Sequence, residues 1–148
     1  KSLYQQHSRG DLPVVVDDTY QLLLHSEAAL VTSGTATLET ALLGVPEVVC
    51  YKGGALSYQI GKRLVNVDYI SLVNLIMEQE LVTELIQGEM NPQRVAEELH
   101  KLLEPSKAAH LKAQYKVLRE KLGGVGASQR AAELMVKKLR EADRKTKD

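Results

Sequence analysis

The chain has 148 residues, of which 44% are hydrophobic and 26% charged. This size and composition fit one globular domain with a core of its own. Nineteen basic and nineteen acidic side chains cancel, so nothing in the charge predicts a nucleic-acid partner, and no apolar run is long enough to predict a membrane span.

The first predicted unit is a strand followed by a helix. Val14–Val16 is a β-branched run, and Asp17 to Thr19 offers good N-cap residues before the helical stretch YQLLLHSE. Only a polar segment, with no strand and helix of its own, comes before Val14. We therefore expect the domain to be incomplete at its N-terminal side.

The second unit contains the most informative stretch, LVTSGTATLETALLGVPEVVCYK. Ala28 to Thr32 predicts a strand, apolar positions recur at helical spacing from Thr35, and Gly44 with Pro46 predicts the helix end. Glu47 to Tyr51 predicts the next strand. Strands that alternate with helices indicate a parallel sheet with helices on its faces, so the predicted fold class is α/β.

The rest of the chain predicts mostly helices. One is expected over residues 57–67, and the YISLVNLI that follows is apolar enough to be buried. Further helices are expected from Asn91 and Pro92, from Ser106, and from Ser128, where the charged end is too polar to pack fully. The positions predicted to be buried in the first two of these are Val95, Leu99, Leu102, Leu103, Leu111, Tyr115, Leu118 and Leu122.

The break Ser33-Gly34-Thr35 is compatible with an anion site. A parallel strand that opens into a helix leaves unpaired N–H groups at the carboxyl edge of the sheet and at the positive end of the helix dipole. Gly34 lets a phosphate approach the backbone, and Ser33 and Thr35 can add hydroxyl donors. Glu39, about one turn further, can accept hydrogen bonds from two ribose hydroxyls. From these residues alone, a capped turn with a solvated glutamate is slightly favoured.

Four motifs in order resemble those of the lipid-A-disaccharide synthase family. They are SGTATLE, PEVVCY, YISLVN and ELIQ, similar to the family's SGTA-x-LE motif, P-x-V-x-x-Y strand, Y-x-SLPN motif and ELLQ helix. The similarity runs from about Leu12 to the last helix, and Val73 stands where the family has proline. Related UDP-N-acetylglucosamine transferases also place a glutamate on the ribose at this offset. The nucleotide-binding residues that the resemblance implies are Ser33, Gly34, Thr35, Ala36, Glu39 and Asn74.

The resemblance implies a fold as well as a site. Residues 1–148 are expected to form the C-terminal nucleotide-sugar-binding domain of a GT-B glycosyltransferase, a partial Rossmann-like parallel sheet with flanking helices. Residues 106–148 are expected to be the terminal helices of the same domain. The catalytic groups are expected on an N-terminal domain that this chain lacks, so we assign no catalytic residue and expect the chain alone to be inactive.

The reaction that the resemblance implies is inverting and metal-independent. UDP-2,3-diacylglucosamine is the expected donor and 2,3-diacylglucosamine 1-phosphate (lipid X) the expected acceptor. The products are the β-1,6 lipid A disaccharide and UDP. The expected location is cytoplasmic, peripheral at the surface of the inner membrane, and no cofactor is expected.

Two other interpretations stay open. Another UDP-N-acetylglucosamine enzyme of similar fold, such as the peptidoglycan transferase or the 2-epimerase, shares an S-G-x-x-x-x-E-like loop but lacks the YISL-x-N and ELIQ pair. A non-catalytic truncated module could instead associate with another copy through an unpaired sheet edge.

Other side chains with potential chemistry form no pattern. The histidines lack metal-ligand spacing with one another or with Cys50, so no metal is expected. Cys50 lies in an apolar run and fits a core position and a reducing, cytoplasmic setting. Ser33 is not in a G-x-S-x-G elbow, which argues against a nucleophile. The four histidines are His7, His25, His100 and His110. Lys52, Lys62 and Arg63 could contact the diphosphate or lipid head groups, but a solvated helix face is favoured.

Overall fold

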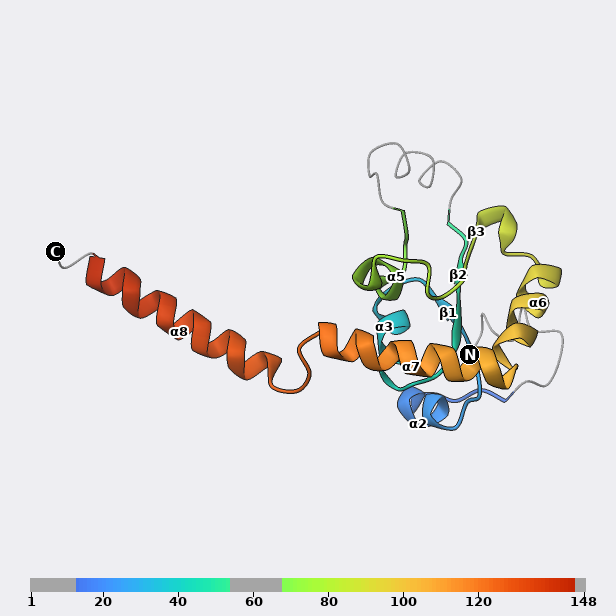
Figure 1. Ribbon diagram of the computed structural model, residues 1–148, viewed down its shortest axis with the longest axis horizontal. Coiled ribbons are helices and arrows are strands. Elements are labelled where there is room, and N and C mark those ends of the chain that lie inside the picture. Colours follow the sequence, from blue (N-terminus) through green and yellow to red (C-terminus); the bar gives the residue numbers. More distant parts are fainter. Residues whose placement is uncertain (1–12, 54–67, 146–148) are drawn as a thin grey trace.

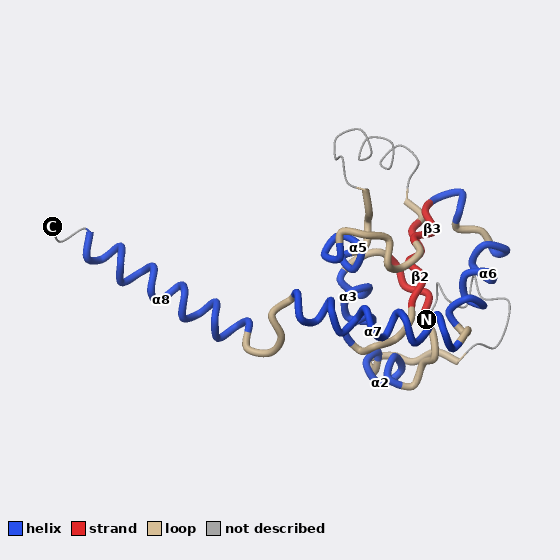
Figure 2. Tube along the Cα trace, in the orientation of Figure 1, coloured by secondary structure: helices blue, strands red, loops and turns tan. Residues whose placement is uncertain are grey.

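The computed structural model describes residues 13–53 and 68–145, with side chains to residue 140. In these residues three strands form a parallel sheet in the order β1 (Ala29–Thr32), β2 (Glu47–Tyr51) and β3 (Glu84–Ile86). Thr32 of β1 pairs with Cys50 of β2, and Cys50 pairs with Leu85 of β3. β2 is the central strand. The predicted α/β class is confirmed, and Figure 2 shows the strands in red among the helices in blue.

Helices cover both faces of this sheet (Figure 1). Helices α3 (Thr35–Leu42) and α5 (Leu72–Met77) lie on one side, and α6 (Pro92–Leu102) lies on the other. Helix α7 (Pro105–Lys121) contacts α3, α5 and α6 and so closes the body across the sheet.

Three further helices lie outside this arrangement. Helix α2 (Thr19–Leu24) precedes β1, and the short 3₁₀ helix η1 (Gln87–Glu89) follows β3. Helix α8 (Ala127–Lys145) extends away from the body (Figure 1), and its described side chains, up to residue 140, are all exposed. Within residues 13–53 and 68–145, no helix has both the length and the apolar character that crossing a membrane needs.

The core forms around β2, because a central parallel strand is covered on both faces and therefore reads as a continuous apolar run. Val48 and Val49 are fully buried. Each fully buried aliphatic side chain contributes about 1.5–3 kcal/mol by leaving water. The other principal core residues come from α3, α5, β3 and α7 and the turns between them: Ala41, Val73, Met77, Leu81, Val82, Leu85, Leu111, Tyr115 and Leu118.

Two predicted helix boundaries are confirmed by their geometry. Gly44 follows α3 with φ of 80°, the left-handed conformation that glycine adopts most readily. Asn91 is the N-cap of α6, where its side chain accepts a hydrogen bond from the Arg94 N–H, and Pro92 occupies the first helical position. Both boundaries are specified by residues at the helix ends, so they could be predicted from the sequence.

Three predictions about single elements are wrong. Val14–Val16 is not a strand in the described structure, and its side chains are 48–63% exposed. The third strand is instead Glu84–Ile86, which was expected to be helical and pairs with Val49 to Tyr51. Leu103 and Leu122 are exposed rather than buried, since each is the C-cap of its helix, where the buried face ends. The helix expected over residues 57–67 lies outside the described residues.

Candidate functional site

The carboxyl ends of the three strands meet at one edge of the sheet, because the strands are parallel. Backbone and side-chain bonds connect the segments that leave this edge. The Ser33 N–H donates to the Cys50 carbonyl at 3.4 Å, and the Gln87 Nε2 donates to the Gly53 carbonyl at 3.2 Å. The Ser33 turn therefore lies at the edge where open α/β sheets place their ligands.

The turn from β1 into α3 has an open backbone. Gly34 is the N-cap of α3 with φ of 150° and ψ of −163°, and a Cβ built on it would meet no atom within 4 Å. Gly34, Thr35 and Ala36 are exposed. The first N–H groups of a helix have no carbonyl partner within it, so this exposed turn offers backbone donors, and the space beside the Gly34 Cα is open. An L side chain rarely adopts the φ of Gly34, which accounts for glycine there.

Ser33 differs from its neighbours because it is part-buried. Its Oγ donates a hydrogen bond to the Ile70 carbonyl at 3.1 Å. A hydroxyl has one proton to donate, so in this conformation Ser33 cannot also donate to a phosphate. The expected hydroxyl donor role is open to Thr35, which is exposed, while Ser33 joins the turn to the YISLVN segment.

Glu39 is exposed on α3, one turn after Thr35. The Tyr20 hydroxyl of α2 donates to its Oε2 at the long distance of 3.4 Å. A carboxylate has about four acceptor positions, so this bond leaves capacity for a ligand. Sequence reasoning missed Tyr20, because the contact joins two helices that no local spacing relates.

Asn74 is fully buried rather than open to a ligand. Its Nδ2 donates to the Val82 carbonyl at 2.8 Å and to Glu84 Oε1 at 2.9 Å, and its Oδ1 accepts from the N–H groups of Leu81 and Val82, both at 2.9 Å. All four hydrogen-bonding positions of the amide are therefore occupied within the protein. Asn74 holds α5 against the start of β3.

Val73, in place of the family's proline, is the second residue of α5 and is fully buried in the core. The first turn of a helix tolerates proline because its N–H groups have no partner within the helix. Ser71 caps this turn by accepting a hydrogen bond from the Asn74 N–H at 3.1 Å. Either residue is therefore compatible with the geometry, and valine adds apolar packing.

Two ionisable groups of β2 have shifted pKa values. Burial raises the pKa of the Glu47 carboxyl to about 9, and burial also raises the pKa of the Cys50 thiol. Glu47 is at the amino end of the strand, away from the turn at Ser33. Among the residues whose structure is described, no three His, Cys, Asp or Glu side chains gather as a metal site would require.

A parallel sheet with flanking helices and a glycine turn at its carboxyl edge is consistent with part of a Rossmann-like domain of the GT-B type. The family model described as "Lipid-A-disaccharide synthetase" matches residues 3–139, and the chain belongs to this family. The sequence resemblance to this family is thus confirmed.

Relatives named "Lipid-A-disaccharide synthase" come from several bacteria. The protein of Syntrophus aciditrophicus is 45% identical over 126 residues, which is 84% of this chain and 33% of the relative. The protein of Geobacter sulfurreducens is 39% identical over 87% of this chain and 34% of its own length. That of Nitrosococcus oceani is 39% identical over 92% of this chain and 35% of its own length. The chain spans about a third of the length of these relatives.

Proposed function

We propose that this chain is the donor-binding part of a lipid-A-disaccharide synthase, a glycosyltransferase that uses UDP-2,3-diacylglucosamine as donor and lipid X as acceptor. In this proposal the N–H groups of Gly34, Thr35 and Ala36 bind the diphosphate, and Glu39 accepts hydrogen bonds from the ribose. The matched family supports the reaction. Residues 1–148 would then form the C-terminal nucleotide-sugar-binding domain, with residues 106–148 as its terminal helices.

The observation that carries the proposal is the open turn at Gly34. It is exposed, it lies at the carboxyl edge of a parallel sheet, and it starts a helix whose N-terminus favours an anion. Glu39 follows on the same helix with acceptor capacity to spare. In UDP the diphosphate is followed by the ribose. The turn at Gly34 is followed by Glu39 in the corresponding order along the chain.

The chemistry that this site can supply is positioning and charge stabilisation. In an inverting displacement, the acceptor hydroxyl oxygen bonds to the anomeric carbon while the bond to the diphosphate breaks. The N–H groups at the turn would stabilise the charge that develops on the leaving UDP. The acceptor proton would pass to a base on the part of the protein outside this chain, which also would hold the acceptor sugar.

We include two further features in the proposal. The reaction is metal-independent, because backbone N–H groups can stabilise the leaving diphosphate without a cation. The enzyme works at the cytoplasmic surface of the inner membrane, because the acyl chains of donor and acceptor keep them in a membrane and the UDP-sugar donor is a nucleotide of the cytoplasm. For the first feature, turnover by a full-length protein that includes this segment should survive EDTA, and loss of turnover would contradict it.

The deciding experiment is a titration of the chain with UDP and with 2′-deoxy-UDP. If Glu39 accepts a hydrogen bond from the 2′-hydroxyl, the unmodified chain should bind UDP roughly tenfold or more tightly than the deoxy form, since a hydrogen bond to a charged group contributes about 1.5–3 kcal/mol. Glu39→Ala should bind both nucleotides equally and no better than the unmodified chain binds the deoxy form.

The matched control is Glu27→Ala, which removes an exposed carboxylate just before β1, at the opposite edge of the sheet. This variant should keep both the UDP affinity and the preference for UDP. A folded chain that does not bind UDP, or a Glu39→Ala variant that still prefers UDP, would contradict the proposal. Size exclusion on the same samples tests the alternative of a non-catalytic truncated module. If that alternative is right, the chain should self-associate and not bind UDP.

A further inference from the structure

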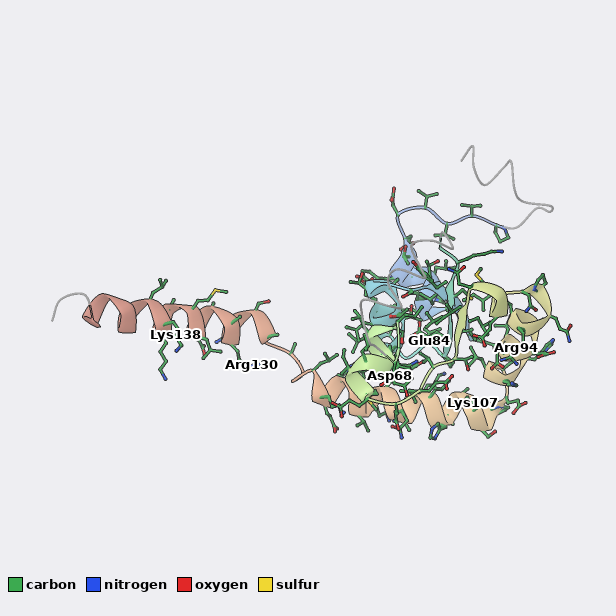
Figure 3. All side chains as sticks on the ribbon, turned by 90° about the horizontal axis from the view of Figure 1, so that it is seen from above. Asp68, Glu84, Arg94, Lys107, Arg130 and Lys138 are labelled. Carbon is green, nitrogen blue, oxygen red and sulfur yellow. The ribbon has the colours of Figure 1, made fainter. Side chains whose placement is uncertain are left out.

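The carboxylate of Glu84 is the centre of a hydrogen-bond network beside the SGT turn. Glu84 is the first residue of β3, and its Oε2 accepts from the Ile70 N–H at 2.9 Å. Its Oε1 accepts from the Ser71 N–H and from the Asn74 Nδ2, each at 2.9 Å. Figure 3 places Glu84 within the body of the protein, in contrast to Arg130 and Lys138 out on α8.

The peptide group between Ile70 and Ser71 connects this carboxylate to the turn. Its N–H, that of Ser71, donates to Glu84 Oε1 at 2.9 Å, and its carbonyl, that of Ile70, accepts the hydrogen bond from Ser33 Oγ at 3.1 Å. Hydrogen bonds on the two ends of one peptide group polarise each other, so a carboxylate on the N–H strengthens the bond that the carbonyl accepts. Ser33 is adjacent to Gly34 in the chain. The orientation of the Ser33 side chain therefore depends on where Glu84 holds the backbone of Ile70 and Ser71.

The far side of the network is buried and fully hydrogen-bonded. Asn74 is fully buried, and its Oδ1 is fixed by the N–H groups of Leu81 and Val82. Asn74 in turn donates to Glu84. Glu84 therefore ties buried Asn74 to the Ile70–Ser71 backbone, and that backbone is bonded to Ser33 at the start of the exposed turn. Its three donors also offset its negative charge, which lessens the repulsion of an anion bound at the turn.

We propose that Glu84 is a positioning residue for the nucleotide site: through the Ile70–Ser71 peptide group and Ser33 it sets the conformation of the Gly34–Ala36 turn. This inference rests on the proposed UDP site. Glu84 itself touches no nucleotide. Its effect on affinity must therefore pass through Ser33, and this coupling can be measured.

The test is a double-mutant cycle of UDP affinity with Glu84→Gln and Ser33→Ala in the full chain. A glutamine at position 84 replaces one acceptor oxygen by an amide NH₂ that faces N–H donors, so at least one of the three bonds is lost. We expect each single variant to bind UDP about tenfold more weakly than the unmodified chain. The double variant should lose no more UDP affinity than the weaker-binding single variant, because both substitutions break the same connection.

The matched control is Glu98→Gln on α6. Glu98 is also mostly buried and accepts a hydrogen bond from Lys101 Nζ at 2.7 Å, and α6 packs on the opposite side of the sheet from α3. This variant should lose stability in thermal unfolding and keep its UDP affinity. Glu84→Asp, which keeps the charge on a shorter side chain, should be milder than Glu84→Gln and serves as the second variant if Glu84→Gln does not fold.

The outcomes are distinct. If the unmodified chain does not bind UDP, the proposed function fails, and this inference fails with it. If the unmodified chain binds UDP but folded Glu84 variants bind within twofold of it, the inference alone is overturned. Losses that add in the double variant would also overturn it, since they would show that Glu84 and Ser33 act independently.

Discussion

The Ser33–Ala36 turn and the Ile70–Asn74 segment are neighbours, joined by the bond from Ser33 to Ile70, yet they use their polar groups in opposite ways. Gly34, Thr35 and Ala36 are exposed, whereas Ser71 and Asn74 are fully buried with their polar side chains hydrogen-bonded inside the protein. Both segments match motifs of the same family. The exposed residues of these motifs are therefore open to a ligand, whereas the hydrogen-bonding groups of the buried Asn74 side chain are occupied within the protein.

The largest effect is expected from Asn74→Ala, which tests whether the second segment is structural. The substitution removes the partners of both the N–H and the carbonyl of buried Val82. A buried polar group left unpaired costs about 1–3 kcal/mol, so we expect the free energy of unfolding to fall by about 4 kcal/mol, measured with urea. Asn91→Ala, which removes the exposed N-cap bond and two exposed bonds to the Gly88 and Glu89 carbonyls, should lose about 1 kcal/mol because water can replace these partners. Equal losses in the two variants would contradict the comparison.

The next largest effect concerns Glu47, whose polar group is neither exposed like those of the Gly34 turn nor buried and hydrogen-bonded like that of Asn74. It is fully buried, yet neither oxygen of its carboxylate has a hydrogen-bond partner among the described residues. Burial raises the pKa of Glu47 to about 9 in the folded state, whereas the unfolded chain ionises with a pKa near 4.5. The folded state therefore binds a proton that the unfolded state releases.

Stability should consequently fall as the pH rises from about 4.5 to about 9, and the loss should reach about 3 kcal/mol at pH 7. Glu47→Gln should remove this slope from urea unfolding measured across the same pH range. The exposed control Glu27→Gln should keep the slope. A Glu47→Gln variant with an unchanged pH dependence would show that Glu47 is ionised in the folded protein.

The third prediction compares two glycines that both have positive φ and open space around them. Gly34 is at the start of α3 and Gly44 follows its end, with φ of 150° and 80°. Alanine at either position strains the backbone, so each variant should lose about 1–2 kcal/mol of stability. Only Gly34→Ala should weaken UDP binding, by tenfold or more in the folded fraction, because its methyl group occupies the open side of the turn. A folded Gly34→Ala chain with normal UDP affinity would contradict the phosphate site.

The elements that could be predicted from the sequence are those specified by nearby residues. The strand at Ala29–Thr32, the helix from Thr35 and the strand Glu47–Tyr51 follow from apolar spacing and from the helix stop at Gly44. Their order also placed the SGT turn at the carboxyl edge of the sheet. The open backbone at Gly34 follows from the same local pattern, in which a glycine lies between the strand and the helix.

The features that could not be predicted depend on partners elsewhere in the chain. Val14–Val16 has strand propensity, but a strand also needs a neighbour, and in the described structure none pairs with it. Asn74 is saturated by groups 7, 8 and 10 residues away, which come close only because the chain turns back from α5 into β3. The same fold gives Glu84 its partners at Ile70, Ser71 and Asn74, which the ELIQ motif could not predict.

The smallest effect is expected from Tyr20→Phe, which tests how strongly the exposed turn region is pre-organised. The Tyr20 hydroxyl donates to Glu39 Oε2 at 3.4 Å between two exposed side chains, a length at which a hydrogen bond is weak. Its loss should change stability by less than about 0.5 kcal/mol, as is usual for surface substitutions. UDP affinity should fall less than threefold, and the preference for UDP over 2′-deoxy-UDP should remain, because Glu39 keeps its acceptor oxygens. If Tyr20→Phe instead removed that preference as completely as Glu39→Ala, the orientation of Glu39 would depend on its hydrogen bond to Tyr20 of α2. The exposed turn region would then be pre-organised by a specific contact, as the buried segment is.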